Sequence, residues 1–205
     1  MRDRLGTVAI FGAIGVALVG FHFWGQSQRH REWWWVGGSP EGMLFLDLAN
    51  TREGNGHLLM TFIEPEDGAM AHEFDVTWTC RDQSVSWGEV WTLDNAMRQI
   101  ERYPSPRVLN EVHHARGASE LLVLQIACAR PPERARMRTL RVERPPIEVT
   151  GLAHRLMGES VPSFGALMLA AHDPRQDAMV YERLMTRYVP AERIARVRQL
   201  TGAME

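Results

Sequence analysis

Ala71–Thr79, AHEFDVTWT, is the stretch that decides the fold class. Its residues alternate between an apolar and a polar set, with Phe74, Val76 and Trp78 in the first and Glu73, Asp75 and Thr77 in the second. Successive side chains of a β-strand point to opposite faces, so this alternation predicts a half-buried strand.

Comparable runs lie on both sides of this strand. Upstream they are Trp33–Val36, Met43–Leu48 and His57–Glu64, and downstream there is Ser84–Leu93. Turn segments rich in Gly, Pro and Asn separate them. Short β-rich runs at such spacing are typical of an antiparallel meander.

The triplet Trp33, Trp34 and Trp35 opens the first strand. We expect core and interface aromatics here rather than a sugar-stacking platform. If the triplet is a strand, alternation requires that at least one ring is exposed.

A helix is predicted over Glu120–Ala129, with Ser119 as its N-cap and Glu120 in the first turn, where the helix dipole favours an acid. This helix would pack across the meander and bring Cys128 back to Cys80, the other cysteine of the chain. For an extracytoplasmic body, one disulfide is the economical interpretation, and two buried thiols are the alternative.

The order of Trp33, the strand Leu44–Asp47 (LFLD), the strand His72–Cys80 (HEFDVTWTC) and the helix segment SELLVLQIAC resembles bacterial surface-adhesin E-like domains over residues 33–130. The resemblance implies a small exported protein built on a central antiparallel sheet, and it implies no catalytic residue. This chain departs from the family in having an apolar N-terminal helix rather than a lipidated cysteine, and in its C-terminal extension.

Leu5–Trp24, LGTVAIFGAIGVALVGFHFW, is apolar and long enough as a helix to cross a bilayer. The alternative is a cleaved secretory signal, although the run exceeds the usual signal core and ends in aromatic residues suited to the headgroup level. Small residues form one face suited to packing against another membrane helix, unless they only reflect membrane composition: Gly6, Ala9, Ala13, Ala17 and Gly20.

Charge is unevenly distributed along the chain. All 23 basic residues are arginine; residues 32–128 carry 6 of them against 15 acids, and residues 129–205 carry 13 against 9. Nucleic-acid binding by the acidic body is therefore not expected. The arginines between Pro131 and Pro146 suggest either an extended arm that contacts an acidic partner or anionic headgroups, or a solvated linker.

The last sixty residues are predicted to be helical, with one helix capped by Asp173. Phe164–Ala171 is apolar nearly all round and must be buried, either against the protein's own helices or against a partner. Phe164 and Leu167, together with the Trp33–Trp35 triplet, are the predicted partner contacts.

The sequence contains no recognisable catalytic, metal-binding or phosphate-binding motif. His57, His72 and the pair His113-His114 lack metal-ligand spacing, and neither a nucleophile elbow nor a glycine-rich phosphate loop is present. We therefore assign no catalytic, cofactor-binding or metal residue.

The predicted architecture is α+β: an N-terminal transmembrane helix, an antiparallel sheet domain with one covering helix, and a helical C-terminal extension. The expected domains are 1–31 (anchor and stem), 32–130 (sheet), 131–148 (Arg/Pro-rich arm) and 149–205 (helical tail). The expected function is that of a non-enzymatic accessory or assembly subunit of an integral membrane protein complex, bound to the bacterial inner membrane by one span with its body in the periplasm. A membrane-tethered periplasmic enzyme, or a ligand-binding or adhesin-like protein, is the alternative.

Overall fold

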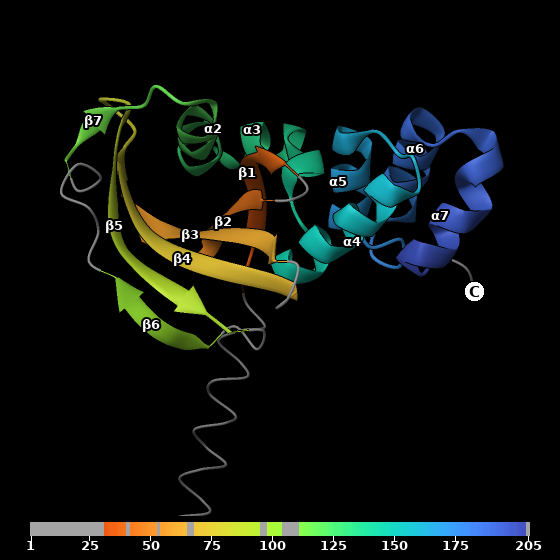
Figure 1. Cartoon of the computed structure of the whole chain (residues 1–205). Helices are drawn as coiled ribbons and strands as arrows, with labels where there is room; N and C mark the ends of the chain where they lie inside the picture. Colours follow the sequence, from red (N-terminus) through yellow and green to blue (C-terminus); the bar gives the residue numbers. More distant parts are fainter. Residues whose placement is uncertain are drawn as a thin grey trace, which may run out of the picture. The chain divides into compact units, whose positions relative to one another are not determined.

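Seven antiparallel strands follow one another in the computed structural model, which describes residues 31–39, 42–52, 54–64, 68–94, 98–103 and 111–203. The strands are β1 (Trp33–Ser39), β2 (Gly42–Arg52), β3 (Asn55–Glu64), β4 (Gly68–Thr79), β5 (Ser84–Leu93), β6 (Gln99–Tyr103) and β7 (His113–His114). Strands β1 to β6 are neighbours in chain order, and the short β7 pairs with β5 (Figure 1). The predicted antiparallel meander and the α+β class are confirmed.

Both faces of the sheet carry buried residues at β1 to β4. Alternate residues of β2 enter two cores: Met43 and Phe45 lie in one, and Leu46 and Leu48 lie in the other. Helix α2 (Ala118–Ala127) covers the Leu46 face, and α4 (Pro146–Gly158) covers the Phe45 face. The expectation of one covering helix was therefore incomplete.

The tryptophan triplet of β1 contributes side chains to both cores. Trp33 and Trp35 pack into the core beneath α4, whereas Trp34 packs into the core beneath α2. Trp33 and Trp34 are buried and Trp35 is half-buried, so the expectation of an exposed ring was wrong. That expectation assumed that one face of the sheet is exposed to solvent, whereas both faces are covered at β1.

Helix α2 begins earlier than predicted. Its N-cap is Gly117, not Ser119. The Glu120 carboxylate accepts hydrogen bonds from the backbone N–H groups of Arg116 and Gly117, which satisfies the helix start from within the first turn. At the other end, Cys128 lies at disulfide distance from Cys80, as predicted, with Cα atoms 5.6 Å apart.

The arginine-rich segment is neither extended nor a free linker. It forms α3 (Pro131–Arg136) and the 3₁₀ turn η1 (Arg138–Leu140). Its last part then lies along the outer edge of β1, where Arg141 bridges to Trp34 and the Val142 N–H donates to the Trp33 carbonyl at 2.8 Å. The Pro-Pro pairs begin helices rather than breaking them, because proline suits the first helical turn.

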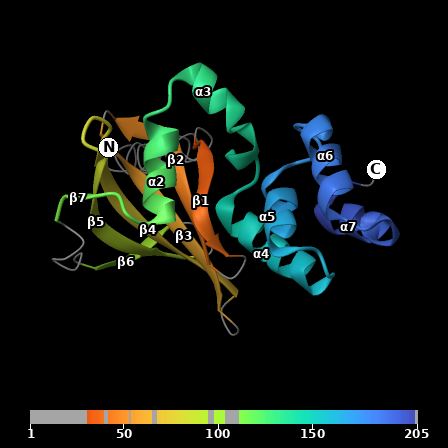
Figure 2. The same cartoon turned by 90° about the horizontal axis from the view of Figure 1, so that it is seen from above.

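Four helical elements follow α4: α5 (Ser163–Ala171), α6 (Ala178–Tyr188), η2 (Ala191–Arg193) and α7 (Ile194–Thr201). Figures 1 and 2 show these helices grouped beyond α4, next to the sheet. Helix α6 is capped by Asp177, whose side chain accepts from the Val180 N–H, so the predicted cap at Asp173 was wrong by four residues. Residues 32–205 form one compact unit, and the separate boundaries at 130 and 148 stay predictions.

The predicted membrane helix, Leu5–Trp24, lies outside the described residues. So do its small residues Gly6, Ala9, Ala13, Ala17 and Gly20. In the part of the chain that the structure describes, every helix is too short or too polar to cross a bilayer.

The disulfide closes a loop of 48 residues, and its removal should destabilise the body. Chain entropy predicts a loss of about 4 kcal/mol for a loop of this length. We expect the double variant Cys80→Ser/Cys128→Ser to unfold at a much lower urea concentration than wild type. Equal midpoints, or two alkylatable thiols in freshly isolated protein, would contradict this prediction.

Gly165 allows α5 and α6 to approach closely. A Cβ added there would lie 2.6 Å from the Tyr188 Cβ, whereas one added at Gly158 would meet nothing within 4 Å. Gly165→Ala should therefore destabilise the protein by about 1–3 kcal/mol through overpacking. The control Gly158→Ala should leave stability equal or slightly higher, because alanine favours helix. Thermal unfolding that ranks the two variants the other way would refute this packing.

Candidate functional site

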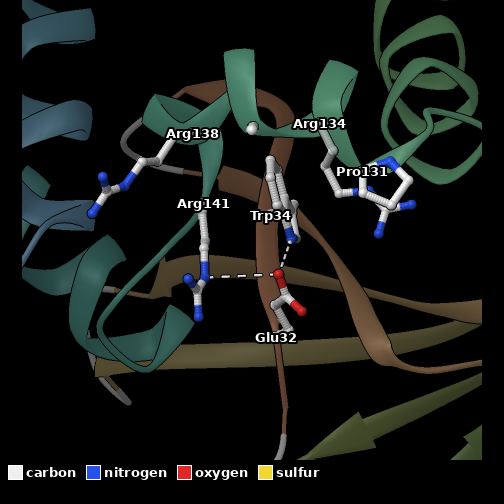
Figure 3. Close-up of a pocket in the computed structure, with 7 residues that line it drawn as sticks. Glu32, Trp34, Pro131, Arg134, Arg138 and Arg141 are labelled. Atoms are coloured by element: carbon white, nitrogen blue, oxygen red, sulfur yellow. Dashed lines mark hydrogen bonds and ion pairs between the residues drawn. The ribbon is translucent and has the colours of Figure 1, made fainter.

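A pocket of about 310 Å³ lies where the arginine-rich segment crosses β1 (Figure 3). It is lined by Glu32, Trp34, Pro131, Arg134, Ala135, Arg138 and Arg141. The strand provides the floor, and α3, η1 and the residue that follows η1 provide the other walls. Three guanidinium groups and one carboxylate make this lining basic.

Glu32 and Trp34 form the polar part of the floor. The Trp34 indole Nε1–H donates to Glu32 Oε1 at 3.1 Å, and Arg141 Nε lies 3.7 Å from the same oxygen. Trp34 itself is only 3% exposed, because its ring belongs to the core beneath α2. The indole therefore holds the carboxylate at the pocket from a rigid position (Figure 3).

The other two arginines have different partners. Arg134 donates from Nη2 to the Ala129 carbonyl at 3.0 Å, while its Nε is buried and makes no hydrogen bond. Arg138 forms an ion pair with Asp177, the cap of α6, and in Figure 3 its guanidinium points away from Trp34. Of the three arginines that line the pocket, Arg134 and Arg141 are therefore the ones placed to contact a ligand.

A second polar cluster surrounds Glu120 on α2. Its Oε1 accepts from His113 Nε2 at 2.9 Å and from the Trp87 indole at 3.2 Å, and its Oε2 accepts the two backbone N–H bonds of the helix start. Burial alone would raise the pKa of Glu120, but these hydrogen bonds outweigh it and lower the pKa to about 2. The hydrogen bond to Glu120 in turn raises the pKa of His113.

The hydrogen bonds of this cluster connect elements of the fold. Both His113 ring nitrogens are occupied, Nε2 by Glu120 and Nδ1 by the Glu111 carbonyl at 3.0 Å. A histidine that donates from both nitrogens has no lone pair with which to act as a base. The cluster instead ties β7, β5 and the start of α2 together.

Three further histidines each contact a polar group. His57 pairs with Asp75 at 3.1 Å, His72 bonds to Thr92 at 3.1 Å, and His114 lies 2.9 Å from the Asp82 carbonyl. Among the residues that the structure describes, no three metal-ligating side chains of His, Cys, Asp or Glu gather at one point.

The predicted partner contacts are placed as follows. Trp33 and Trp34 are buried and Trp35 is half-buried; Leu167 is 2% exposed, and Phe164 is 48% exposed. The apolar segment Phe164–Ala171 forms α5, whose buried residues belong to the core under α4. Burial within the chain therefore accounts for its composition, and of these contacts Phe164 has the most side chain open to a partner.

Sequence reasoning placed Arg134, Arg138 and Arg141 only among the arginines between Pro131 and Pro146, and it did not consider Glu32. Their spacing carries no signal of the pocket, because Arg134 lies on α3, Arg138 lies on η1 and Arg141 follows η1.

Comparison of the chain with protein families, curated proteins and solved structures finds no match. The resemblance to surface-adhesin E-like domains stays a prediction.

The Glu120 cluster predicts a pH dependence of stability. The lowered pKa of Glu120 stabilises the fold above pH 4.5, and this stabilisation is lost as the pH falls towards 2. The raised pKa of His113 stabilises it below pH 6.5, and this part is lost as the pH rises through that pKa. Glu120→Gln should lower stability by about 2 kcal/mol near pH 5.5, the scale of hydrogen bonds to a charged group, and by less near pH 2.

Urea unfolding of both proteins across this pH range tests the prediction. Glu111→Gln is the matched control, because the Glu111 backbone carbonyl, rather than its carboxylate, contacts His113. A constant difference between Glu120→Gln and wild type at every pH would show that the Glu120 charge plays no part.

Proposed function

We propose that this protein is a non-enzymatic accessory or assembly subunit of a bacterial membrane protein complex. One transmembrane helix, Leu5–Trp24, anchors it in the inner membrane, and its body lies in the periplasm. The partner is an integral membrane protein.

The outer edge of β6, with which no other strand of the described residues pairs, carries this proposal. All five residues of β6 are exposed, and among the described strands only β5 pairs with it. Ile100 is 62% and Tyr103 43% exposed on this edge. A strand edge without a partner is a template for pairing with another chain, and apolar side chains beside it add contact area.

Two further observations support the assignment. The cysteine pair at disulfide distance suits an oxidising compartment such as the periplasm. The most connected ionisable cluster, that of Glu120, is occupied by structural hydrogen bonds. The arginine-lined pocket favours a second candidate, a tethered protein that binds a small anion, and the two functions are compatible in one molecule.

A charge placed on the β6 edge should weaken the complex. We expect Ile100→Lys to reduce the amount of specific partner recovered with the tagged full-length chain in mild detergent by about tenfold, the effect of losing one interface anchor. Leu121→Lys is the matched control, because Leu121 is also an exposed apolar residue but lies on α2. Ala13→Leu/Gly20→Leu should weaken recovery through the membrane helix.

Quantitative mass spectrometry of the recovered proteins compares the variants. Circular dichroism must show equal folding of Ile100→Lys and Leu121→Lys. If Ile100→Lys and Ala13→Leu/Gly20→Leu both recover the same proteins as wild type, the accessory-subunit proposal fails.

A further inference from the structure

We propose that the arginine-lined pocket at β1 binds a phosphate group, with Arg134 and Arg141 as its ligands. The group is the phosphate of an anionic lipid headgroup or of a free phosphate. The site stands on the pocket geometry, and only the lipid source also rests on the proposed membrane anchor.

Unused donors are the first argument. Arg134 Nε is buried without a hydrogen bond, and the bond from Nη2 to the Ala129 carbonyl fixes the guanidinium in place. A buried donor without a partner costs free energy, and a shift of the Arg134 side chain that lets a ligand oxygen reach Nε would recover this cost. Arg141 forms an ion pair with Glu32 in which Nε lies 3.7 Å from Oε1, beyond hydrogen-bond distance, so this contact leaves Nε without a hydrogen bond to the carboxylate.

The arrangement of the two arginines selects the chemistry. Arg134 belongs to α3 and Arg141 follows η1, and Figure 3 shows them on different sides of Trp34 and Glu32. A carboxylate has two coplanar oxygens and fits a single guanidinium fork, whereas the tetrahedral oxygens of a phosphate can meet two guanidinium groups that approach from different directions. A pocket of about 310 Å³ suits a small ligand or a headgroup.

Arg138 has a different role in this site. Its ion pair with Asp177 connects the pocket wall to the start of α6, so we assign it to positioning rather than to binding.

Substitution of Glu32 is expected to affect binding in the opposite direction to substitution of the arginines. Its carboxylate is the only acidic group in the pocket lining and is held there by the Trp34 indole. It therefore opposes an incoming anion. Glu32→Gln removes this charge and keeps an oxygen to accept from the indole, so it should strengthen phosphate binding, whereas loss of the arginines should weaken it.

Sequence distance favours a lipid source. Only seven residues separate Trp24, the end of the predicted membrane helix, from Glu32. Basic groups close to a membrane surface attract anionic headgroups. Under the proposed anchor, the pocket lies within the chain's reach of the bilayer surface.

The test compares four full-length proteins: wild type, Arg134→Gln/Arg141→Gln, Glu32→Gln and Arg136→Gln. Arg136 is the matched control, because it is an exposed arginine of the same helix α3 outside the pocket lining. Titration with inorganic phosphate in detergent, at constant ionic strength and with acetate as the competing carboxylate, measures the free-phosphate arm. Native mass spectrometry of protein released from nanodiscs of phosphatidylcholine with phosphatidylglycerol measures the lipid arm.

We expect the double arginine variant to bind at least about tenfold more weakly than wild type in one arm, Glu32→Gln to bind more tightly, and Arg136→Gln to match wild type. Binding in the lipid arm alone identifies a headgroup site, and binding in the phosphate arm identifies a site for free phosphate. Equal binding by all four proteins in both arms, or equal weakening by Arg136→Gln, would overturn the proposal. Because neither arm uses a partner protein, this result is independent of the co-purification test.

Discussion

Burial of both faces of the sheet is the constraint on which the rest of this structure depends. Leu46 and Phe45 are neighbours on β2, yet they lie in different cores, so each face needs its own cover. Helix α2 covers one face and α4 covers the other, and the residues between these helices must therefore pass around an edge of the sheet. They pass at β1, where the backbone of Arg141 and Val142 pairs with the strand and closes the edge. The arginine-lined pocket is a consequence of this crossing.

The same crossing explains which features the sequence could predict. Alternation within Ala71–Thr79 was enough to place a strand, because one polar and one apolar face is the simplest pattern. It could not show that Trp33, Trp34 and Trp35 would all be packed against other elements. One face of β1 is covered by α4, a helix more than a hundred residues further along the chain. The cap of α6 was missed for a similar reason: Asp173, which Pro174 follows, has the stronger local signal, but Asp177 caps α6 and also pairs with Arg138 from another element. The pocket itself required tertiary contacts to be seen.

Two polar clusters in this molecule show how the setting of a charge determines its role. Glu120 has donors on both oxygens from the side chains and backbone of nearby elements, which keeps it ionised and confines it to structure. In the pocket the balance is reversed, because the arginines outnumber the single carboxylate and one buried guanidinium nitrogen has no acceptor. A cluster whose hydrogen bonds are complete stabilises the fold, whereas one with donors left over is able to bind a ligand.

The β6 edge and the pocket lie at opposite ends of the strand order, since β1 and β6 are the two edge strands of the main path. The β1 edge is covered by the arginine-rich segment, and among the described residues the β6 edge has no such cover. A partner that pairs with β6 would therefore leave the pocket accessible, and a phosphate bound between Arg134 and Arg141 would not compete with it. This separation lets one small body contact a protein through backbone pairing at one edge and an anion through guanidinium groups at the other.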